Sequence, residues 1–74
     1  REIVDIAPEE LANVYKYIAD EYKLIAIDAA DRELIKILGF TRVTQKVRKH
    51  LAKSLEIAEK RGYLKTVKNK IIGN

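Results

Sequence analysis

Apolar positions in the first third of the chain recur at the spacing of an α-helix. Pro8 has the fixed φ that suits a first helical position, and Glu9 and Glu10 follow it near the positive end of the helix dipole. The apolar residues after them share one face at a period of about 3.6 residues: Leu11, Val14, Tyr15, Ile18 and Tyr22. The pattern predicts an amphipathic helix that starts near Pro8, with Tyr15 and Tyr22 in the core.

A short apolar run, residues 23–27, is too brief for a helix and predicts an extended connection or a minimal strand. Asp28 is a good N-cap for a second helix, and Gly39 supplies its C-terminal stop. The buried stripe of this helix is expected at Ala30, Leu34, Ile37 and Leu38. Phe40 is expected to fill the space between the second and third helices.

A third helix is predicted to begin at Thr41 or Thr44, both acceptable caps, and to end near Arg61, before Gly62. Its core face is expected at Val43, Val47, Leu51, Leu55 and Ala58. Two β-prone runs follow, residues 63–67 and 70–72, separated by Lys68 and Asn69. Because Asn tolerates positive φ, a tight hairpin is expected there.

The predicted fold class is therefore mostly α with a small β-hairpin, in the element order of a three-helix winged helix-turn-helix. No linker or repeat divides residues 1–74, so one domain is expected, and 47% hydrophobic residues suffice for a helical core. The chain lacks cysteine and has one histidine, which leaves no basis for disulfides or the usual zinc sites. No apolar stretch reaches the length of a membrane span, and no signal peptide is evident. Because the chain begins at Arg1 and has no methionine, we expect a piece excised from a larger cytoplasmic protein.

Positive charge is concentrated in the second half of the chain. Residues 1–35 carry four basic and nine acidic side chains, a net of −5, whereas residues 36–74 carry eleven basic and two acidic ones, a net of +9. Five of these basic residues recur at helical spacing opposite the apolar face of the third helix: Arg42, Lys46, Lys49, Lys53 and Lys60. A surface of this kind attracts polyanions.

The basic helix face predicts a nucleic-acid interface, with double-stranded DNA as the expected ligand. In helix-turn-helix proteins the second helix of the motif enters the major groove, where Gln pairs with adenine and Lys or Arg with guanine. Lysines on the hairpin would hold phosphates in a neighbouring groove. The candidate binding residues are Arg42, Thr44, Gln45, Lys46, Lys49, Lys53, Lys65, Lys68 and Lys70. A merely solvated helix face would explain the amphipathic pattern but not its single sign of charge.

Arg48 is among the early residues of the third helix that would face the DNA groove but, like Arg61, it falls off the basic stripe. Both are expected to pair with carboxylates such as Asp28, Asp31 or Glu33.

Catalysis finds little support in the sequence. His50 and Ser54 are four residues apart and would meet on a helix, but no positioned third carboxylate accompanies them. His50 is expected to be a half-buried edge residue. We expect no catalytic residue, no metal site and no cofactor.

Several segments in order resemble the small C-terminal winged-helix domain, of unknown function, of bacterial and archaeal helicase-like proteins of superfamily one. The matching segments cover residues 6–11, 32–35, 38–43, 47–48 and 58–64. The chain departs from this pattern at Thr44 and Gln45, where a small Gly-Ser-like pair is expected. The resemblance implies a DNA-processing context, in which ATP hydrolysis or cleavage belongs to other parts of the parent protein.

The primary hypothesis is thus a non-catalytic DNA-binding accessory module of a helicase-like or nuclease-like protein, monomeric as an isolated domain. The rival hypothesis is a protein-docking module whose basic face contacts an acidic surface of its own parent chain. In that case Tyr17 and the apolar pair Ile71 and Ile72 are candidate contact residues.

Overall fold

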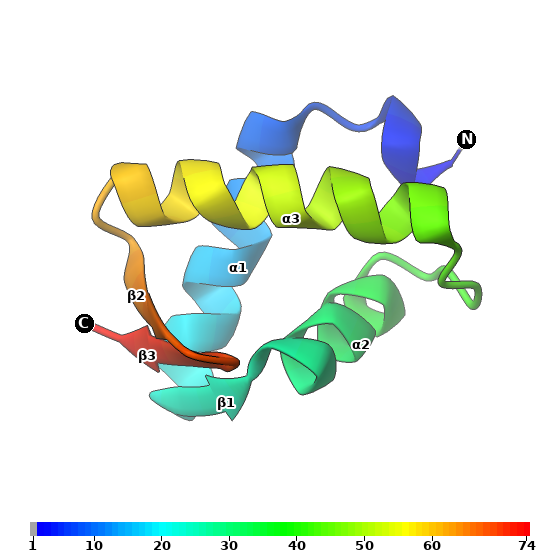
Figure 1. Cartoon of the computed structure of the whole chain (residues 1–74). Helices are drawn as coiled ribbons and strands as arrows, with labels where there is room; N and C mark the ends of the chain where they lie inside the picture. Colours follow the sequence, from blue (N-terminus) through cyan, green and yellow to red (C-terminus); the bar gives the residue numbers. More distant parts are fainter. Residues whose placement is uncertain (1) are drawn as a thin grey trace.

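The computed structural model describes residues 2–74, and Arg1 lies outside that range. Three helices and a small antiparallel sheet make up the fold, which confirms the predicted mostly helical class (Figure 1). The elements are the short 3-10 helix η1 (Ile3–Asp5), α1 (Pro8–Tyr22), β1 (Leu24–Ala26), α2 (Ile27–Ile37), α3 (Gln45–Lys60), β2 (Leu64–Val67) and β3 (Lys70–Gly73).

The predicted starts of two helices are confirmed. α1 begins at Pro8, and α3 begins directly after Thr44, whose Oγ1 accepts a hydrogen bond from the Val47 N–H at 3.2 Å. This cap satisfies one of the N–H groups that a helix start leaves without an intrahelical partner. At its other end α3 is followed by Gly62, with φ of 75°, a backbone conformation that glycine adopts without steric cost.

The predicted N-cap of α2 is wrong. The helix begins at Ile27, two residues earlier than an N-cap at Asp28 would place its start, and Ala26 is the capping residue. The reason is tertiary: the Ile27 N–H donates to the Asn69 carbonyl at 2.7 Å, so the hairpin turn satisfies the helix start. Asp28 instead lies in the first turn, where its charge favours the helix dipole.

The sheet has the strand order β1-β3-β2, with every pair antiparallel. The predicted minimal strand after α1 is therefore present as β1, and it pairs with the central strand β3. In the hairpin turn Lys68, rather than Asn69, takes positive φ (57°). A two-residue hairpin can obtain its right-handed twist from positive φ at the first turn position alone.

The core lies where α1 crosses behind α3 and meets α2 and the inner face of the sheet (Figure 1). The largest fully buried side chains are Leu11, Tyr15, Ile18, Leu34, Leu51, Ser54, Leu64 and Ile71. Phe40 packs against this core from the α2–α3 connection, as predicted. Ile3 and Ile6 are also buried, although no sequence pattern indicated that the segment before α1 joins the core.

Three residues predicted to be in the core are exposed. Tyr22 is 50% exposed, Ile37 45% and Val43 37%. Tyr22 and Ile37 are the last residues of α1 and α2, and Val43 precedes the start of α3. Tyr22 and Ile37 lie at helix ends that extend past the packed core, whereas the predicted place of Val43 on the core face of the third helix is wrong because α3 starts after it.

Gly73 is a position where the sheet lies directly against the α1 backbone, and its substitution tests that packing. A Cβ atom there would lie 2.3 Å from the Ala19 carbonyl oxygen, a backbone atom that cannot move independently. We expect Gly73→Ala to lower the free energy of unfolding by about 1–3 kcal/mol, measured by chemical denaturation. Lys70→Ala, exposed on the same strand, is the control; equal midpoints for the two variants would contradict this packing.

Candidate nucleic-acid interface

Three predicted lysines of α3 lie together on its outer surface. Lys46, Lys49 and Lys53 are exposed, and with Val4 and His50 they line a shallow groove of about 400 Å³ between α3 and η1. The contribution of η1 was not predicted from the sequence. This groove concentrates three positive charges on one side of the domain.

His50 and Ser54 hold this region together instead of forming a catalytic pair. The His50 Nε2 lies 2.7 Å from the Ile6 carbonyl oxygen, which only accepts, so this nitrogen carries the hydrogen and donates it. The buried Ser54 Oγ donates to the His50 carbonyl at 2.9 Å and is not directed at the imidazole ring. His50 is half-buried, as predicted, and it fixes the segment before α1 against α3.

The N-terminal end of α3 adds further positive potential. Arg42, Thr44 and Gln45 are exposed there, and no acidic residue lies in the first turn. The Thr44 oxygen accepts from Val47, which leaves the hydroxyl hydrogen available to an external acceptor. The positive end of the helix dipole is thus not neutralised by its own side chains.

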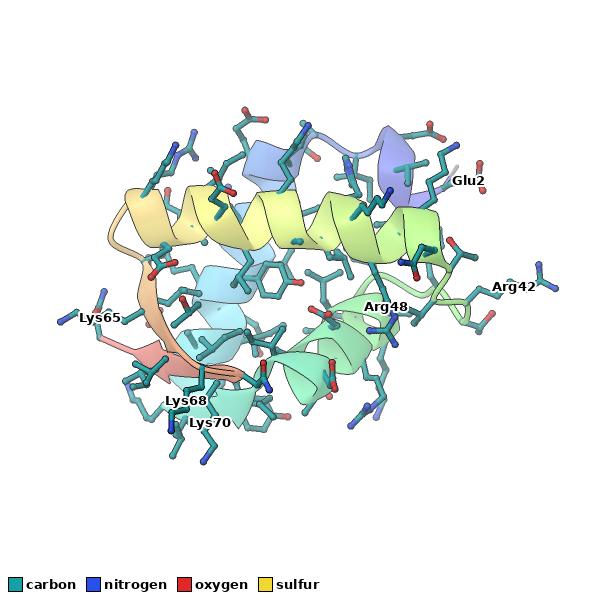
Figure 2. All side chains as sticks on the ribbon, in the orientation of Figure 1. Glu2, Arg42, Arg48, Lys65, Lys68 and Lys70 are labelled. Atoms are coloured by element: carbon teal, nitrogen blue, oxygen red, sulfur yellow. The ribbon has the colours of Figure 1, made fainter. Side chains whose placement is uncertain are left out.

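Arg48 turns away from this surface. Figure 2 shows it pointing from α3 toward α2, where its Nη1 lies 3.8 Å from Asp28 Oδ1. The predicted structural pairing of Arg48 is therefore confirmed, although both side chains are largely exposed and such pairs contribute little stability. Arg61 is exposed and forms none of the ion pairs within residues 2–74.

The hairpin lysines form a second, separate group. Lys65, Lys68 and Lys70 are exposed on the hairpin, with Lys68 and Lys70 near its turn and Lys65 apart from them, whereas Arg42 lies at the opposite end of α3 (Figure 2). Lys65 is paired with Ile72 across the strands, and Lys70 with Val67, so the lysines share the outer sheet face with exposed apolar side chains.

The two acidic residues of residues 36–74, Glu56 and Glu59, each contact a nearby side chain. Glu59 accepts hydrogen bonds from the Thr66 hydroxyl at 3.0 Å and the Thr66 N–H at 3.4 Å, which attaches β2 to α3. Glu56 lies 3.9 Å from Lys60 on the following helical turn. Glu59 therefore fixes the hairpin beside the helix that carries the lysines.

Tyr15 of α1 and Asp31 of α2 form a buried polar pair. The Tyr15 hydroxyl donates to Asp31 Oδ1 at 2.5 Å, and the two residues are 0% and 8% exposed. Burial raises the pKa of Asp31 above its ordinary value, and the Tyr15 hydrogen bond and nearby Arg48 only partly oppose this. Burial likewise raises the pKa of Tyr15, which stays protonated.

Comparison with known proteins assigns no relatives: no protein family, curated protein or solved structure matches this chain. Within the described part of the chain, no helix has both the length and the apolar character needed to cross a membrane. No group of three or more His, Cys, Asp or Glu side chains in residues 2–74 is placed to hold a metal ion.

The Tyr15–Asp31 pair is expected to make the stability of the fold depend on pH. Because the folded state raises the pKa of Asp31, its contribution to stability is complete below the ordinary Asp pKa and is lost as pH rises through the folded value. Asp31→Asn keeps an acceptor for Tyr15 but cannot ionise. We expect the stability of this variant relative to wild type to increase from about pH 4 upward and then level off.

Tyr15→Phe should instead become less stable relative to wild type as pH rises, because it removes the hydrogen bond that favours the Asp31 carboxylate. We expect a loss of about 1–3 kcal/mol, larger at neutral pH than at acid pH. Denaturation curves across pH measure both variants. A pH-independent difference between wild type and Asp31→Asn would contradict the burial of an ionising Asp31.

Proposed function

We propose that this domain is a non-catalytic DNA-binding module of the winged-helix class. α2 and α3 take the place of the helix-turn-helix, and the β2–β3 hairpin takes the place of the wing. The succession of three helices and a hairpin supports this assignment, as does β1, inserted between α1 and α2 and paired with β3. The connection between α2 and α3, residues 38–44, is longer than the three or four residues common in such motifs.

The observation that carries the proposal is the cluster of Lys46, Lys49 and Lys53 on the outer surface of α3. Lysines at this density repel one another, and no carboxylate of residues 2–74 forms an ion pair with any of the three. A phosphate backbone supplies the missing negative charge and releases its condensed counterions when it binds.

The candidate residues divide into two roles in this proposal. Gln45, Lys46 and Lys49 lie in the first half of α3 and face base edges in the major groove, while Arg42, Thr44 and Lys53 contact phosphates. The hairpin lysines contact the backbone further along the duplex: Lys65, Lys68 and Lys70.

The parent of such a module is a larger helicase-like or nuclease-like protein that carries the chemistry elsewhere. This context rests on the sequence resemblance alone. In the alternative, the same basic surface docks on an acidic surface of the parent protein without touching DNA, and the experiment below separates the two.

Charge reversal tests the interface. We expect the domain to bind a short generic duplex with micromolar or weaker affinity at physiological salt, because one small module makes few contacts. With four to six phosphates contacted, log K should fall against log salt with a slope of about −4 to −5. Lys46→Glu, Lys49→Glu and Lys53→Glu together should abolish binding in fluorescence anisotropy.

The matched control is Lys16→Glu, Lys23→Glu and Lys36→Glu, which changes the net charge equally at exposed positions outside α3. This control should keep most of the affinity, and circular dichroism should show both variants folded. Unchanged binding in the α3 variant, or equal losses in both, would overturn the α3 interface. No binding of wild type even at low salt would favour the alternative of an acidic protein surface.

A further inference from the structure

A second surface lies between α1 and α2, separate from the lysine groove. It is a groove of about 260 Å³ lined by Tyr17, Ile18, Glu21, Tyr22, Glu33 and Ile37. No lining residue is shared with the groove that carries Lys46, Lys49 and Lys53. At about 100° per residue, Tyr17 is roughly 200° around α1 from the buried Tyr15, so it lies on the side opposite the core face of the helix.

Three large side chains with apolar surface are left in solvent at this groove. Tyr17 is 57% exposed, Tyr22 50% and Ile37 45%. Single exposed apolar residues are ordinary, but here three of them line one groove, together with polar atoms. Tyrosine is among the residues enriched at protein interfaces, because it combines a large apolar ring with a hydroxyl.

The charge at the groove has one sign. Glu21 and Glu33 are its only ionisable lining residues apart from the tyrosines, and neither carboxylate takes part in an ion pair or side-chain hydrogen bond within residues 2–74. Both belong to the half of the chain with a net charge of −5. A complementary ligand is therefore apolar where it meets the tyrosines and positively charged where it meets the glutamates.

We propose that the groove between α1 and α2 docks a basic amphipathic helix of a protein partner. Apolar side chains at helical spacing on the partner enter between Tyr17, Tyr22 and Ile37, and flanking Lys or Arg residues pair with Glu21 and Glu33. Helices laid into apolar grooves bind through anchors at i, i+3, i+4 and i+7. With DNA on α3, the same domain would connect nucleic acid to a protein, although the groove does not depend on DNA binding.

The test uses three synthetic peptides and the isotope-labelled 74-residue chain. One peptide carries Leu at i, i+3, i+4 and i+7 with Lys elsewhere, the second has the same composition scrambled, and the third replaces Lys by Glu. We expect the amphipathic basic peptide alone to give saturable NMR shifts, centred on Tyr17, Tyr22 and Ile37. Equal shifts with the scrambled peptide, or none with any, would overturn the proposal.

Variants at exposed positions identify which contacts matter. The double variant Tyr17→Ala, Ile37→Ser should lower the affinity for the peptide at least about tenfold, the equivalent of about 1.4 kcal/mol. The double variant Glu21→Gln, Glu33→Gln should lower the affinity for the peptide at low salt and make that affinity depend less on salt. The lysine-reversed α3 variant is the control and should bind the peptide as wild type does. Loss of peptide binding in that control, or self-association of the domain through the groove, would overturn the proposal.

The readouts separate this inference from the DNA-binding proposal. The groove variants should bind duplex DNA with unchanged affinity, and the α3 variant should lose only DNA. Failure of the peptide experiment with intact duplex binding overturns the groove alone, and the reverse result overturns the DNA interface alone.

Discussion

The buried hydroxyl of Tyr15 is the constraint on which the arrangement of the helices depends. Its ring fills the core between α1 and α3, and a hydroxyl at 0% exposure must find a partner inside the protein. Asp31 of α2 supplies that partner at 2.5 Å, so one directional hydrogen bond fixes α2 relative to α1 within an otherwise non-directional apolar core. Apolar packing alone would tolerate several placements of a helix as short as α2.

The hairpin is likewise positioned by polar groups, one within β2, one in the turn and one at the end of β3. The Asn69 carbonyl accepts from the start of α2, Thr66 donates to Glu59 of α3, and the Gly73 N–H donates to the Lys23 carbonyl after α1. Each helix therefore holds one part of a sheet that would be too small to be stable alone. These bonds place the hairpin lysines relative to α3, which matters if both groups contact one ligand.

Local signals in the sequence predicted most of the element boundaries, because caps, glycines and helical periodicity act within a few residues. Pro8, Thr44 and Gly62 mark ends that the structure reproduces. The start of α2 was misplaced because a residue more than forty positions away satisfies it. The burial of Ile3 and the hydrogen bond of Tyr15 to Asp31 were missed for the same reason, since contacts between distant segments leave no periodic signal. Sequence placed the lysines on one face of α3 but could not reveal the groove against η1 or the second groove between α1 and α2.

The size of the domain determines how far its acidic and basic surfaces act on each other. Its extents are 31 × 20 × 19 Å, whereas electrostatic interactions in physiological salt decay over about 8 Å. Fixed charges separated by most of the molecule are therefore screened from each other, and a net charge of +4 does not describe either surface. The lysines of α3 attract polyanions through their local field, while Glu21 and Glu33 retain a field of opposite sign at their own groove. The two proposed ligands, of opposite charge, are therefore compatible with each other, because neither surface must neutralise the other.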